Sequence, residues 1–87
     1  MYIKDGYLLR EVTGNYLIMP LKGELNFKKL MTLNETGAFL WRHLEKGATR
    51  EMLLDRMMEE YEVDEQTACR DLDVFLKQLA EIGALHE

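Results

Sequence analysis

The side chains best suited to chemistry in this 87-residue chain are one cysteine and two histidines, Cys69, His43 and His86. A metal site needs ligands at short, characteristic spacings, and these three residues lie far apart in the sequence. A single free cysteine usually packs as a small apolar residue, which we expect of Cys69, and both histidines are expected on the surface. The sequence therefore predicts no metal site.

Larger catalytic motifs are also missing from the sequence. It contains no glycine-rich phosphate loop and no nucleophile beside a base at a readable spacing. No pair of carboxylates stands apart from the generally acidic surface. We therefore expect a protein that is not an enzyme and that needs no cofactor.

Length and composition limit the fold to one domain, residues 1–87, with a single small core. A chain with 47% hydrophobic and 31% charged residues is typical of a globular protein. Its N-terminus, MYIKDGYLLR, has no apolar run long enough for a signal peptide or a membrane helix. One cysteine cannot form an internal disulfide, and both features predict a cytoplasmic protein.

Charge is divided unevenly along the chain. Residues 1–34 hold five Lys or Arg against three Asp or Glu, whereas residues 35–87 hold six against thirteen. The first part is therefore mildly basic and the second clearly acidic. Because acidic surfaces repel phosphate backbones and anionic lipids, we expect neither nucleic acid nor a membrane as partner.

Three apolar stretches bounded by turn residues predict strands, at Tyr7–Val12, Tyr16–Met19 and Lys28–Leu33. Thr13–Asn15 is expected to form a turn, because its central glycine tolerates positive φ. Pro20 lacks an N–H and should weaken or end the ladder of the second strand. Leu21–Asn26 is then a loop or a bent extension, and Met1–Gly6 is expected to be loose.

Three stretches with an apolar repeat near 3.6 residues predict helices, at Glu35–Leu44, Arg50–Tyr61 and Glu65–Ile82. Each follows a favourable N-cap, which is Asn34, Thr49 or Asp64. Gly37 lies in the first turn of the first helix, where a missing side chain allows close approach. Met57 and Met58 of the second helix are expected to pack in the core.

The order of three strands and then three helices predicts an α+β fold. Adjacent strands with short connections favour an antiparallel meander. We therefore expect a three-stranded antiparallel sheet followed by a three-helix bundle, an arrangement that is winged-helix-like with its wing placed first.

The third helix has more apolar surface than a core contact requires. At about 100° per residue, its apolar positions spread over roughly 160°, whereas a core-facing stripe needs little more than about 100°. The surplus flank consists of Leu76, Cys69 and Ala80, with Asp73 and Lys77 beside it. Two interpretations remain open, in which this flank is covered by the sheet or forms one wall of a ligand groove.

Three stretches carry a resemblance to a known family: YLIMPLKG at Tyr16–Gly23, LNETGAFLW at Leu33–Trp41 and DLDVFLKQLAEIGAL at Asp71–Leu85. The chain resembles coenzyme PQQ synthesis protein D (PqqD), a family of small peptide-binding domains in pathways that modify ribosomally made peptides. The family pattern has LN before a helix of small residues, and an Asp-x-x-x-Phe-Leu-x-x-Leu tail ending near Gly-x-Leu. Members that serve pyrroloquinoline quinone synthesis tend to carry Pro-Glu-Gly before the third strand, where this chain has PLKG.

The resemblance implies a non-catalytic chaperone that binds the leader of a precursor peptide and presents it to a modifying enzyme, commonly a radical S-adenosylmethionine protein. It implies that the leader adds as an extra strand to the third strand, with side chains entering a groove against the third helix. The expected peptide-binding residues are those of this strand and of the surplus flank: Lys29, Leu30, Met31, Thr32, Leu33, Cys69, Asp73, Leu76, Lys77 and Ala80. Among them, Met31 is expected to be the adaptable contact.

An edge strand leaves N–H and C=O groups unpaired on one side. Lys28 and Lys29 fit two roles there, which are steering an acidic leader and guarding the edge against aggregation. With such an edge, we expect a monomer or a weak homodimer.

A winged-helix DNA-binding regulator is the rival hypothesis, because its helical order is similar. Between Glu65 and Ile82, however, two basic residues stand against four acidic ones. A recognition helix should offer Arg, Lys, Asn or Gln to phosphates and base edges. Peptide binding is therefore the leading hypothesis.

Overall fold

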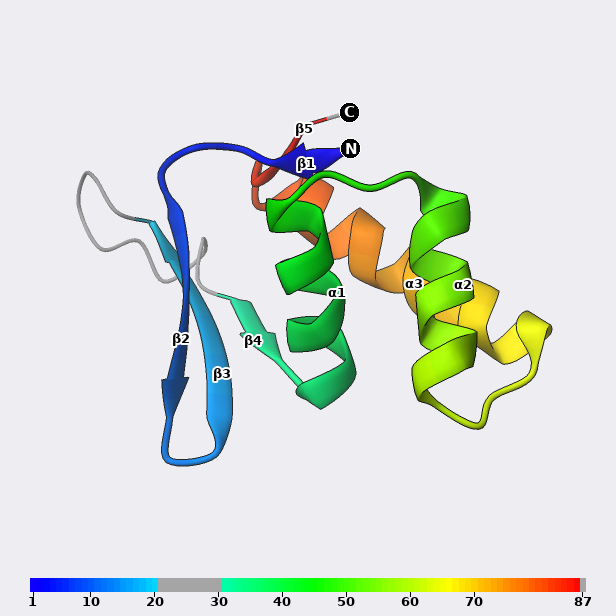
Figure 1. The fold of residues 1–87 in the computed structure, drawn as a ribbon. Coiled ribbons are helices and arrows are strands. Elements are labelled where there is room, and N and C mark those ends of the chain that lie inside the picture. The colour runs from blue at the N-terminus through cyan, green and yellow to red at the C-terminus, as the bar shows by residue number, and fades with distance from the viewer. Residues whose placement is uncertain (21–30, 87) are drawn as a thin grey trace.

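The computed structural model describes residues 1–20 and 31–86. In chain order its elements are β1 (Tyr2–Ile3), β2 (Tyr7–Val12), β3 (Asn15–Pro20), β4 (Met31–Leu33), α1 (Glu35–Glu45), α2 (Arg50–Glu60), α3 (Glu65–Glu81) and β5 (Leu85–His86). Strands β2, β3 and β4 form an antiparallel sheet in that order, beside the three helices (Figure 1). The predicted α+β fold is confirmed, whereas its likeness to a winged helix stays a prediction. The predicted Leu21–Asn26 loop and Lys28–Leu30 of the predicted third strand lie outside the described residues.

The hairpin between β2 and β3 turns on Thr13 and Gly14. Both have positive φ, 52° at Thr13 and 79° at Gly14, which is the conformation of a type I′ turn. Val12 pairs with Asn15 across this turn, and the register runs without interruption to Tyr7 opposite Pro20. A two-residue hairpin of this type fixes the phase of the hydrogen bonds along the whole ladder.

The N-terminal residues are ordered, so the prediction of a loose Met1–Gly6 was wrong. Strand β1 pairs antiparallel with β5 at the other end of the chain, where both termini lie close together (Figure 1). The Lys4 N–H donates to the Ala84 carbonyl at 2.8 Å, and the Ala48 N–H donates to the Met1 carbonyl at 2.9 Å. These bonds join residues far apart in sequence, which local patterns do not reveal.

All three predicted N-caps are confirmed. The Gly37 N–H donates to Asn34 Oδ1 at 2.8 Å and the Met52 N–H to Thr49 Oγ1 at 3.1 Å. The Thr67 N–H donates to Asp64 Oδ1 at 2.7 Å. A side-chain cap satisfies one of the orphan N–H groups at a helix start, so these residues fix where each helix begins.

The core lies where β3 and β4 meet the three helices. Its largest fully buried side chains are Trp41, Ile18, Leu40, Leu44, Leu53, Leu72 and Leu79. Met57 is buried as predicted, but Met58 is 41% exposed, so its placement in the core was wrong. None of the described helices is both long and apolar enough to cross a membrane.

The Asp64 cap predicts a specific acid sensitivity. The hydrogen bond from the Thr67 backbone lowers the pKa of Asp64 below its ordinary value of 3.8. A lowered folded-state pKa stabilises the native protein above the unfolded value, and this stabilisation is lost as pH falls through the folded value. Asp64→Asn keeps the cap but removes the titration. We therefore expect its urea midpoint to fall less than that of the wild type between about pH 5 and about pH 2; equal falls would contradict this assignment.

Candidate functional site

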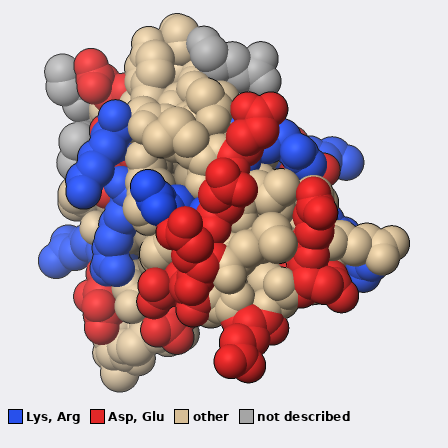
Figure 2. Space-filling view, turned by 45° about the vertical axis from the view of Figure 1, so that its right-hand side comes forward, with Lys and Arg blue, Asp and Glu red and all other residues tan. Residues whose placement is uncertain are grey.

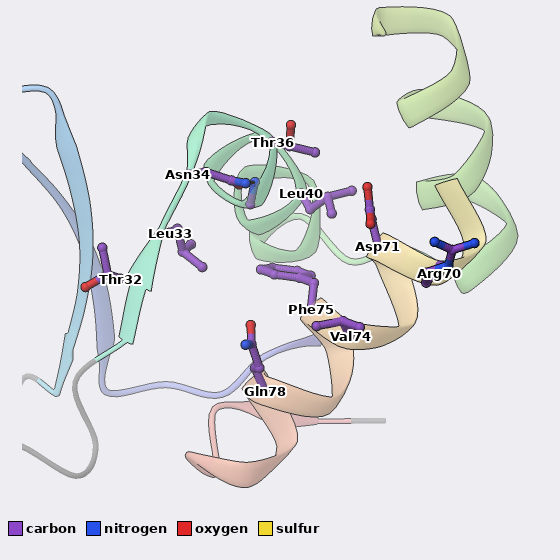
Figure 3. A pocket seen from close by; sticks show the side chains of 11 residues that line it. Thr32, Leu33, Asn34, Thr36, Leu40, Arg70, Asp71, Val74, Phe75 and Gln78 are labelled. Atoms are coloured by element: carbon purple, nitrogen blue, oxygen red, sulfur yellow. Dashed lines mark hydrogen bonds between the residues drawn. The ribbon is translucent and has the colours of Figure 1, made fainter. Parts of the chain in front are cut away.

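A groove of about 480 Å³ opens between β4, the first turn of α1 and one side of α3 (Figure 3). It is lined by Thr32, Leu33, Asn34, Thr36, Gly37, Leu40, Arg70, Asp71, Val74, Phe75 and Gln78. Three separate elements therefore contribute walls, and their positions depend on the packing of α1 and α3.

Strand β4 supplies an open backbone edge beside this groove. Within the described residues β4 pairs only with β3, with Tyr16 opposite Leu33, Leu17 opposite Thr32 and Ile18 opposite Met31. Residues that flank a two-residue hairpin form a hydrogen-bonded pair, and such pairs alternate along an antiparallel ladder. Starting from Asn15, the odd residues of β3 therefore point their backbone groups toward β2, and the even ones point theirs toward β4.

The same alternation continues into β4. Met31 and Leu33 lie opposite even residues of β3, so their N–H and C=O groups are used in the ladder. Those of Thr32 point away from the sheet. Thr32 therefore presents one donor and one acceptor to an incoming strand.

The interior of the groove is apolar and its rim is polar. Leu33, Leu40 and Phe75 are 6%, 1% and 5% exposed, and their side chains face the middle of the groove, whereas Val74 is 52% exposed (Figure 3). Polar groups surround them, with Asp71 and Thr36 toward one end in Figure 3 and Gln78 toward the other. This combination of apolar interior and polar rim is typical of a ligand-binding site.

Gly37 lets β4 approach α1 closely. A Cβ built at Gly37 would lie 3.1 Å from Leu33 Cδ2 and 3.3 Å from Asn34 Oδ1. Contacts this short would force the Leu33 side chain to shift, so the absence of a side chain shapes the groove wall. The predicted close approach at Gly37 is confirmed.

The strand half of the predicted site coincides with the groove only in part. Thr32 and Leu33 line it, whereas Met31 is a buried core residue at 9% exposure, which does not fit an adaptable surface contact. Lys29 and Leu30, with the neighbouring Lys28, lie outside the described residues.

The predicted site residues of α3 lie outside this groove. None of Cys69, Asp73, Leu76, Lys77 and Ala80 lines the groove. At about 100° per residue these five positions centre roughly 150° around α3 from those that do. The surplus apolar flank is therefore not the wall that faces β4 in this structure.

Helix α2 contacts this flank at Asp73. Arg50 at the start of α2 forms a two-point ion pair with Asp73, Nε to Oδ1 at 2.9 Å and Nη2 to Oδ2 at 3.0 Å. The hydrogen bonds that Arg50 donates to Asp73 lower the pKa of Asp73 and raise that of Arg50, and the nearby half-buried Cys69 adds to the rise. Leu76 is half-buried and packs against the core. The flank does not line the groove beside β4, and at Asp73 it borders α2.

Sequence reasoning missed the residues of α3 that do line the groove, Arg70, Asp71, Val74, Phe75 and Gln78. Phe75 belongs to the apolar stripe that packs in the core, and surplus apolar surface does not reveal the polar residues. The one available signal was the Asp71-to-Phe75 spacing in the stretch that carries the family resemblance.

The fold and the groove together define a small α+β domain in which one edge of β4 has no partner strand among residues 1–20 and 31–86, beside a helix-walled groove. The family model of coenzyme PQQ synthesis protein D (PqqD) matches residues 8–85, and the chain belongs to this family. The predicted family resemblance is thereby confirmed. A search of curated proteins gives no match.

Two solved structures are similar over nearly the whole chain. "TbiB1 in Complex with the TbiA(beta) Leader Peptide" is 30% identical, with a TM-score of 0.78, covering 99% of this chain and 95% of that one. "Lasso peptide synthetase B1 complexed with the leader peptide" is 21% identical, with a TM-score of 0.75, covering 98% and 95%. The second likeness concerns the fold alone.

Proposed function

We propose that this protein is a non-catalytic peptide-binding module that holds the leader of a ribosomally made precursor peptide and presents it to a modifying enzyme. The leader adds as a strand to the free edge of β4, and its side chains enter the groove walled by α3. Backbone pairing supplies part of the affinity in such a mode, and side-chain contacts supply selectivity.

The observation that carries this proposal is the position of Thr32. Its outward N–H and C=O groups border the same groove that Leu33, Val74 and Phe75 line. An extended peptide can therefore satisfy backbone groups and bury apolar side chains at once. Membership of the PqqD family and the leader-peptide complex of the 30% identical TbiB1 support the same function.

The class of the modifying enzyme is the finer part of the proposal. Family resemblance predicts a radical S-adenosylmethionine protein. The neighbouring genes test this prediction, because it requires a radical enzyme encoded beside the precursor. Monomeric or weakly dimeric state and a cytoplasmic location stay predictions.

DNA binding receives no support from the charge of α3 or its surroundings. Figure 2 shows acidic side chains in a band that runs from top to bottom through the middle of the viewed face, with basic ones on both sides of it. Within α3 the acidic residues outnumber the basic ones. A phosphate backbone would be repelled along such a helix.

The proposal is tested by titrating isotope-labelled protein with the precursor peptide encoded beside its gene. We expect the amide signals of Thr32, Val74 and Phe75 to shift together, because the peptide would cover the β4 edge and the α3 wall at once. The signals of the α2 residues Glu51 and Asp55 serve as the internal control. A titration that leaves the first set unmoved would refute the function.

A further inference from the structure

We infer that Asp71 is a specificity-determining residue that selects a leader with a lysine or arginine side chain at the α1 end of the groove. This inference rests on the proposed function and adds to it the chemical class of one leader residue. No role for Asp71 follows from strand addition itself, which uses backbone groups.

Asp71 is the one acidic side chain among the groove-lining residues. Figure 3 shows its carboxyl directed toward the side that carries Thr36 and Leu40, whereas the Arg70 guanidinium extends away from them. The ion pairs among the described residues join Arg50 to Asp73 and Arg56 to Glu59. Asp71 has no such partner there, so its carboxylate is available to a ligand.

The surroundings of Asp71 suit both the apolar stem and the charged head of a basic side chain. Val74 is an exposed apolar residue on the same side of α3 as Asp71, and the nearly buried Leu40 and Phe75 line the groove with it. Lysine and arginine lay an apolar stem along such surfaces while the charged head reaches a polar group. An uncharged apolar side chain would leave the carboxylate beside it partly desolvated and unpaired.

A leader strand paired with β4 would pass close to Asp71. Strand β4 leads through Leu33 and Asn34 directly into α1, so a strand paired beside Thr32 also passes the first turn of α1. Successive residues of an extended strand advance about 3.3 Å and alternate between faces. Leu33, one position from Thr32, turns its side chain into the groove. A leader residue an odd number of positions from the one paired with Thr32 therefore turns its side chain into the same groove, toward the Asp71 end.

The experiment selects binders from a displayed library of random peptides on the intact protein. We expect the enriched peptides to carry Lys or Arg at one fixed distance from the apolar positions. Selection on Asp71→Asn should lose this basic preference and keep the apolar positions, and selection on Asp71→Lys should replace it with Asp or Glu. Asp73→Asn, an acidic site on α3 outside the groove, is the matched control and should leave the preference unchanged.

A peptide from the wild-type selection gives the size of the effect. Because Asp71 is exposed, we expect Asp71→Asn to weaken its binding roughly two- to fivefold, more at low salt. An enriched pool without a fixed basic residue, or one unchanged by Asp71→Asn, would overturn the inference but leave peptide binding intact. If no pool is enriched, or if Thr32→Pro does not affect the enriched peptides, the proposed function itself fails.

Discussion

Thr32→Pro is expected to weaken leader binding by about 5- to 150-fold while the protein stays folded. Proline removes the outward N–H of Thr32, and a leader carbonyl that would have accepted from it is left unpaired, at a cost of about 1–3 kcal/mol. The ladder between β3 and β4 is spared, because the Thr32 N–H takes no part in it. Proline is tolerated on edge strands for this reason.

Two variants control this result. Thr32→Ala keeps the N–H and should bind within a few-fold of the wild type. Met31→Pro removes an N–H that faces β3 and a side chain that is 9% exposed, so it should lower the free energy of unfolding by at least about 2 kcal/mol. Binding is measured by calorimetric titration with the precursor peptide, and stability by urea denaturation.

The results for these variants distinguish a wrong binding edge from a wrong hydrogen-bond phase. If Thr32→Pro binds as tightly as Thr32→Ala, the leader does not pair with this edge. If Met31→Pro folds stably and loses binding, the hydrogen-bond phase derived from the Thr13-Gly14 turn is wrong by one residue.

Val74→Asp is expected to lower leader affinity at least about tenfold without a comparable loss of stability. Val74 is 52% exposed in the free protein, so the substitution should change the free energy of unfolding by no more than about 0.5 kcal/mol. In the complex the new carboxylate would be desolvated against an apolar leader side chain without a partner, which is strongly unfavourable.

Leu76→Asp is the matched control, with the same substitution two residues further along α3. Leu76 is half-buried against the core and does not line the groove, so its replacement should reduce stability by about 1–3 kcal/mol and leave the affinity of the folded protein nearly unchanged. Both quantities are measured for both variants by the same titration and denaturation experiments. Loss of binding at Leu76 with stability retained would instead place the leader on the flank beside α2, as the apolar surplus of the sequence suggested.

The sequence by itself determined the three helices, the three strands of the main sheet and their order. Each helix starts at a cap whose side chain reaches an N–H only three residues away, as at Asn34 and Asp64. The hairpin turn depends on two neighbouring residues, Thr13 and Gly14. Interactions this local are encoded in short stretches of chain, so periodicity and turn chemistry are enough to predict them.

The tertiary structure alone decided which parts meet. The pairing of β1 with β5 joins the two ends of the chain, and no local pattern in Met1–Gly6 predicts it. The burial of Met57 and exposure of Met58 likewise depend on the exact direction in which α2 faces the core.

The candidate site, too, was predictable from the sequence only in part. The sequence located the edge strand and the helix beside it, because an apolar stripe marks the side of α3 that packs in the core. It could not decide which flank of that stripe faces β4. That choice depends on how α1 and α2 carry the chain from β4 to α3, and the Arg50–Asp73 contact shows that α2 lies on the Cys69 and Leu76 side. The opposite flank, with Asp71, Val74 and Phe75, therefore forms the groove.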